Sequence, residues 1–299
     1  MEEIDLETFA KLLAKNKIVT KDDLSTVLQI CREQQPMPSI ACKFYLMRCA
    51  NNAFRDADLI DFMLARLVLY VLQTEERKDV TLVDFRDLLI RARETFMKSA
   101  TSGEAGELLQ FLLLEANDIV QLFSKMDLKT SGNMPVHGCD AIHIQVTQGV
   151  VFHFCHSKME AHFAAALTHA LNDVKKFADK PMRQRELHLV SSRLDATKFG
   201  QFAEIIVALI NPYTQRRDLY KEVDSIFIGS NWQFMKDSAK DNDDYLKSEF
   251  EKIIDQTALS VAEKISSMEE IKTRAFLFLT LPFLDVADFR SKFQRELIR

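Results

Sequence analysis

The sequence predicts an α/β fold of the α+β kind, with a small mixed sheet flanked by helices and a helical lobe at each end of the chain. Apolar residues recur with helical spacing near both termini, beginning with the run between residues 6 and 13. At the centre, the alternating segment 142–146, the turn Thr147-Gln148-Gly149 and the apolar segment 150–155 indicate a β-hairpin. Only 7 Gly and 6 Pro occur among 299 residues, which is typical of a folded chain rich in regular structure.

The first ~100 residues are expected to form helices, with a break at Pro36-Met37-Pro38. Thr20 is predicted to cap one helix, Leu59–Gln73 to form a buried helix, and Thr81–Thr95 another. After a loop at Ser99–Gly103, a helix is predicted to begin at Glu104 and to place two carboxylates on its first turn.

Helical periodicity returns after the central hairpin, from Met159 to about Ala178. A buried strand is expected at Glu186–Ser191. The C-terminal third is expected to be helical, apart from a strand at Arg274–Leu281 that precedes a final helix from Val286. We therefore expect a helical N-terminal region at 1–100 and a second domain at 101–299.

Composition restricts the class of protein. The five cysteines are an odd number without a CxxC pair, which favours reduced thiols in a cytoplasmic protein. The acidic start Met1–Asp5 is unlike a signal peptide, and no apolar run reaches the ~18 residues of a membrane span. A net charge of −5 gives no overall attraction to nucleic acid, so any DNA contact must come from local basic clusters. The candidate clusters are Lys175-Lys176, Arg183–Arg185, Arg216-Arg217 and the tail Arg290–Arg299.

The central hairpin carries the residues with the clearest chemistry. His156 and Lys158 are two apart on a strand and share one face, and Asp140 at the start of the partner strand can reach that face. A carboxylate, a second metal ligand and a lysine at one strand end are what metal-assisted phosphodiester hydrolysis requires. Six of the seven histidines fall between residues 137 and 169, but no Cys/His spacing matches a structural zinc site. Neither a Gly-x-Ser-x-Gly elbow nor a phosphate-binding Gly-Lys loop occurs.

The pattern Gly-x-Asp-x-x-His, followed by a strand ending in x-Lys, resembles that of the PD-(D/E)xK nucleases. Four segments together are similar to the HamA C-terminal domain family, which includes the nuclease-like subunit of the Hachiman antiphage system: Gly106–Leu109, Gly138–His143, Ser157-Lys158 and Leu281–Val286. The resemblance covers roughly 101–299. It implies a restriction-endonuclease-like fold, DNA as the substrate, a divalent metal (Mg²⁺ or Mn²⁺) and a helicase partner of the superfamily-2 type.

Carried over by position, the resemblance implies that Asp140 binds the metal, that Lys158 is the catalytic lysine and that Glu107 completes the metal site. His156 departs from the family pattern, which has Glu or Asp there. Imidazole suits softer metals than Mg²⁺, so three interpretations stay open: a softer metal, replacement of the acid by Glu160, or loss of catalysis with binding retained. The expected function is accordingly a metal-dependent DNA nuclease-like subunit in antiphage defence, and the alternative is a non-catalytic scaffold that binds DNA or a partner.

Overall fold

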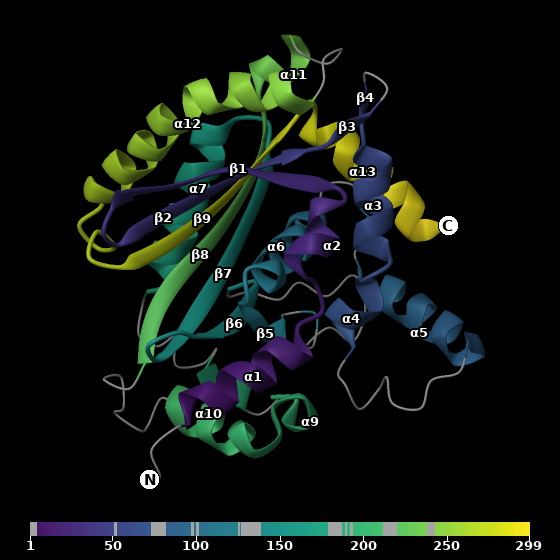
Figure 1. The fold of residues 1–299 in the computed structure, drawn as a ribbon, viewed down its shortest axis with the longest axis vertical. Coiled ribbons are helices and arrows are strands. Elements are labelled where there is room, and N and C mark those ends of the chain that lie inside the picture. The colour runs from purple at the N-terminus through teal and green to yellow at the C-terminus, as the bar shows by residue number, and fades with distance from the viewer. Residues whose placement is uncertain are drawn as a thin grey trace.

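Seven strands form one mixed sheet in the computed structural model, in the order β1-β2-β9-β8-β7-β6-β5 (Figure 1). The central strands β2, β9, β8 and β7 are parallel, while β1 pairs antiparallel at one edge and β6 and β5 at the other. In that order the strands are Leu28–Met37, Ile40–Met47, Ala275–Phe283, Tyr220–Asn231, Val150–Glu160, Ala141–Val146 and Val120–Ser124. A separate two-stranded pair joins β3 (Cys49–Ala50) to β4 (Ala53–Phe54).

The structure describes most of the chain, in the ranges 5–50, 53–72, 82–96, 99, 102–124, 126, 139–178, 187–188, 190–191, 194–211, 220–237 and 243–299. Gly138 and the predicted basic clusters Arg183–Arg185 and Arg216-Arg217 lie outside these ranges. None of the helices within them is long and apolar enough to cross a membrane.

Helices cover both faces of the sheet (Figure 1). One face carries α6, whose thirteen residues are all buried, together with the helices that surround it; the other face carries α7 and α12. The helices on the α6 side are α2 (Lys21–Ser25), α3 (Asp56–Leu64), α4 (Leu67–Val71), α5 (Leu82–Glu94), α6 (Glu104–Ala116) and α13 (Val286–Ile298). On the opposite side are α7 (Phe163–Phe177), α11 (Gln233–Asp237) and α12 (Asp243–Ser266). A third cluster packs against the β5–β6 end and contains α1 (Leu6–Asn16), α9 (Ala196–Phe199), η3 (Gly200–Phe202) and α10 (Ala203–Ile210).

The apolar pattern of β9 explains its central place. Its sequence AFLFLTLPF is apolar on both faces, as expected of a parallel strand covered by helices on each side. Leu277, Leu279 and Leu281 pack toward α6, and Phe276 and Phe278 pack toward α7 and α12.

The predicted fold class is confirmed, as are the central hairpin, the helix beginning at Glu104, the late strand and the final helix. Three predictions about elements are wrong. Residues 28–47 are the strand pair β1–β2 in place of helix, the strand β8 interrupts the C-terminal third, and the described residues of the predicted strand Glu186–Ser191 are helical. The predicted helix from Met159 begins at Phe163, because β7 extends to Glu160.

Candidate functional site

Asp140 lies at the open end of the central hairpin, directly before β6 begins, and β7 extends beyond it. Its backbone N–H donates to the carbonyl oxygen of Cys155 at 2.8 Å, and its Oδ2 accepts the backbone N–H of Ser157 at 2.7 Å. The β6–β7 pairing ends at Ala141↔Cys155, so Asp140 and His156 are the residues that adjoin the last pair on the two strands. The carboxylate is therefore fixed beside the middle of the segment His156-Ser157-Lys158.

His156 is enclosed on the α7 face of the sheet. Its side chain is 3% exposed, its ring meets Phe177 of α7 edge-on at 5.8 Å between centroids, and its Nε2 has no hydrogen-bond partner. Burial lowers the pKa of His156 below its ordinary value of 6.5 and outweighs the nearby carboxylates, led by Asp224, that raise it. The imidazole is therefore neutral at neutral pH.

Lys158 lies on the same face of β7 as His156, two residues further along the strand. Its Nζ is 2.6 Å from Oδ2 of Asp173 on α7, and the other carboxylate oxygen of Asp173 receives Lys176 at 3.3 Å. Burial alone would raise the pKa of Asp173, but its hydrogen bonds and charge interactions with the two lysines outweigh burial and lower it. Asp173 is thus ionised at neutral pH and neutralises part of the charge on Lys158.

Glu107 approaches from the opposite side of the sheet. It lies in the first turn of α6 and is 6% exposed. A Cβ on the preceding Gly106 would lie 3.0 Å from Cγ of Met159 and 3.3 Å from Oγ of Ser157, so this turn packs against the strand face that points away from His156. Burial chiefly raises the pKa of Tyr70, and the charges of Glu107 and Asp140 add to the increase. Asp140 thus interacts electrostatically both with Tyr70 on the α6 side of the sheet and with His156 on the α7 side.

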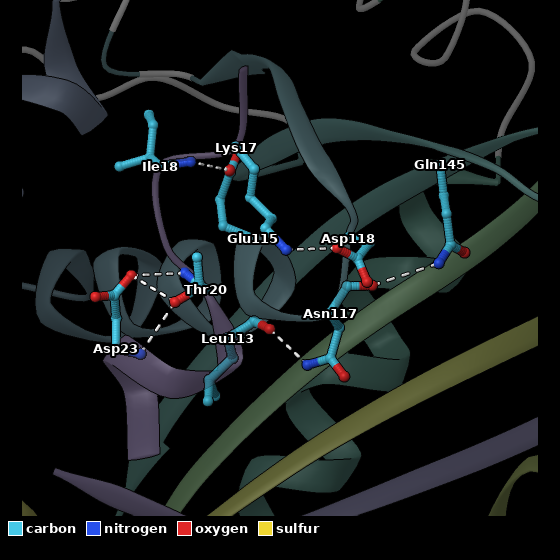
Figure 2. A network of polar contacts seen from close by, with 9 residues as sticks. All are labelled: Lys17, Ile18, Thr20, Asp23, Leu113, Glu115, Asn117, Asp118 and Gln145. Carbon is cyan, nitrogen blue, oxygen red and sulfur yellow. Dashed lines mark hydrogen bonds and ion pairs between the residues drawn. The ribbon is translucent and has the colours of Figure 1, made fainter. Parts of the chain in front are cut away.

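The far end of α6 is anchored by a network of polar contacts (Figure 2). The buried carboxylate of Glu115 accepts the backbone N–H groups of Ile18 and Gln121, each at 2.9 Å, and so links the segment after α1 to β5. Asn117 Nδ2 donates to the carbonyl oxygen of Leu113 at 2.6 Å and closes the end of the helix. This anchor fixes the position of α6 along the sheet, and with it the position of Glu107.

Three charged residues near the site were not predicted from the sequence. In the sequence, Asp173 lies off the apolar stripe of its helix, so it could not be distinguished from a solvent-exposed carboxylate. Asp224 is 0% exposed on β8 and receives Arg274 through two hydrogen bonds, the one from Nη2 at 3.0 Å. The pair was missed because β8 itself was not predicted, although a carboxylate inside the apolar run 223–228 is an unusual signal.

Glu160, the candidate replacement for the acid missing at position 156, contacts His169 in the structure. Its two carboxylate oxygens contact Nδ1 of His169 at 2.8 and 3.0 Å. Across the described part of the chain, no three His, Cys, Asp or Glu side chains are grouped closely enough to hold a metal ion.

Comparison with models of known protein families identifies the family of this chain. The HamA family model matches residues 22–297, nearly the whole chain. The chain belongs to the HamA family. No curated protein matches it. The predicted resemblance is thereby confirmed, and membership implies that this HamA protein is a subunit of the Hachiman antiphage system.

Proposed function

We propose that this HamA protein is the DNA-acting, nuclease-like subunit of a Hachiman complex and works with a superfamily-2-type helicase. The observation that supports this most directly is the position of Asp140, which is hydrogen-bonded to Ser157 between His156 and Lys158. A carboxylate and a lysine at one strand end are the protein groups used in metal-assisted phosphodiester chemistry. A subunit that a helicase brings to DNA also needs little phosphate affinity of its own, which agrees with the net charge of −5.

The residues present do not fit Mg²⁺. This ion takes a near-octahedral set of oxygen ligands, whereas position 156 offers a buried neutral imidazole, and Glu107 lies on the far face of the sheet. Lys158 is paired with Asp173. We therefore derive no hydrolytic step through a metal, and we propose that the chain contributes DNA and partner binding without Mg²⁺-dependent cleavage.

A second function is favoured by what the site retains. Asp140 and Lys158 are both in place, and a neutral imidazole is a better ligand for transition metals than for Mg²⁺. DNA cleavage with Mn²⁺ is the activity that this donor set would support.

Incubation with supercoiled plasmid separates the two functions. The purified protein is tested with Mg²⁺ and with Mn²⁺, in the presence and absence of the helicase, alongside Asp140→Ala and Lys158→Ala. The proposed binding role predicts no nicking or linearisation under any of these conditions. Cutting that both substitutions abolish would establish the nuclease instead.

A further inference from the structure

The ion pair between Lys158 and Asp173 lies at the surface of the candidate site. The side chain of Lys158 is 27% exposed and that of Asp173 is 35% exposed, whereas His156 beside them is buried. Lys158 is therefore the group of the predicted catalytic set that a phosphate of bound DNA could reach on the α7 face. A phosphate that approaches its ammonium meets the carboxylate of Asp173 already in contact at 2.6 Å.

Asp173 occupies the position at which a phosphate would contact the ammonium group of Lys158. The carboxylate of Asp173 contacts both Lys158 and Lys176, so one negative charge engages two ammonium groups. Because the pair is partly solvated it is weak, and a phosphate of DNA can displace the carboxylate.

We propose that Asp173 is a positioning residue that holds Lys158 against α7 and competes with DNA phosphate for its ammonium group. The inference rests on the proposed DNA-binding role. Contact with DNA then requires Lys158 to exchange one anionic partner for another. The net gain from this phosphate contact is smaller than that from an unpaired lysine, because release of counterions from DNA is offset by loss of the Asp173 contact.

The chain offers a matched control on the same helix. Lys175 pairs with Glu270 at 2.5 Å, and both side chains are about half exposed. Asp173→Asn removes the negative charge that contacts Lys158, and Glu270→Gln removes the negative charge that contacts Lys175. They differ in whether the released lysine belongs to the candidate site.

Fluorescence anisotropy with a fluorescein-labelled DNA duplex, over a range of KCl concentrations, measures the effect. We expect Asp173→Asn to tighten binding by about threefold to tenfold and to steepen the salt dependence by about one phosphate contact. Glu270→Gln should give a smaller gain, and adding Lys158→Ala to Asp173→Asn should remove most of the gain. Asp173→Glu, which keeps the charge, should bind DNA as the wild type does.

Each outcome bears on a separate claim. Equal gains from Asp173→Asn and Glu270→Gln, or a gain that survives Lys158→Ala, would overturn the competition while leaving the DNA role intact. DNA binding by none of the variants would overturn the DNA role itself and the inference with it. Thermal unfolding curves of all variants report whether each one is folded.

Discussion

At position 156 an imidazole lies near Asp140, where a hard cation would need a second carboxylate. This histidine also changes the electrostatics of the site. A buried carboxylate at position 156 would repel the half-buried carboxylate of Asp140 in the absence of a metal, whereas a neutral imidazole does not. The site can therefore fold without metal, with Lys158 balanced by Asp173.

His156→Glu tests this at the level of one residue. A carboxylate placed at a position only 3% exposed, near Asp140 and Asp224, should lower the free energy of unfolding by about 1–3 kcal/mol in the absence of metal. Addition of Mg²⁺ should recover part of the loss, because the ion would bind the folded state. Chemical denaturation with and without Mg²⁺ measures both effects.

The exposed His162 provides the control for this substitution, since His162→Glu makes the same chemical change on the surface at the start of α7. It should leave stability nearly unchanged. Identical unfolding of His156→Glu with and without Mg²⁺ would contradict the assignment of position 156 to a metal-ligand place.

Among the elements, the β6–β7 hairpin carries two further buried histidines, His143 and His153, which are cross-strand neighbours on the α6 face. Burial lowers the pKa of each to about 3 from an ordinary 6.5. The unfolded chain therefore binds protons at pH values where these folded residues do not. Stability that is fully present above pH 6.5 is lost as the pH falls toward 3.

The expected slope is about 1.4 kcal/mol per pH unit for each histidine in this window. Glu115 acts in the opposite direction, because burial raises its pKa, but two histidines outweigh one carboxyl group. Urea unfolding at neutral pH and at about pH 5 should show the loss. His153→Gln should reduce the slope by about one proton, and an unchanged slope would show that His153 is not buried in the neutral form.

The elements that could be predicted are those whose signal lies within their own stretch of sequence. The hairpin, α6 and β9 carry local signals: alternation across a Gly turn, a loop before an apolar helix, and a continuous apolar run. The strand β1 has one buried residue in ten and charged side chains, as an edge strand does, so its sequence lacks the alternation of a half-buried strand. The strand β8 begins with polar residues and contains the buried Asp224, which conceals its apolar second half.

In the candidate site, too, only the residues that are close in sequence could be predicted to lie together. Asp140, His156 and Lys158 belong to one hairpin, so their proximity follows from strand geometry. Asp173 and Asp224 come from a helix and a strand packed against that hairpin, and tertiary contacts of this kind leave no signal at fixed spacing. The separation of Glu107 from His156 by the sheet likewise depends on which face α6 covers.

For the whole molecule, the sheet joins segments that the predicted division at residue 100 separates. β2 pairs with β9 from Ile40↔Phe276 to Phe44↔Thr280, and Ile40, Cys42 and Phe44 contribute to the core under α12. Loss of β1 and β2 would expose the edge of β9 and one end of this core.

A chain of residues 101–299 should therefore fail to unfold cooperatively and should aggregate at concentrations where the full chain is monodisperse. Thermal circular dichroism and size-exclusion chromatography would measure this. A cooperative transition and a sharp elution peak for 101–299 would instead support the predicted division into an N-terminal region and an independent nuclease-like domain.

The most direct measurement for the whole protein is a calorimetric titration of the wild type with Mg²⁺ and then with Mn²⁺. A site whose donor groups do not fit Mg²⁺ predicts no saturable binding of this ion. Saturable Mg²⁺ binding by the wild type that Asp140→Ala abolishes would contradict this account of the Asp140, His156 and Lys158 site.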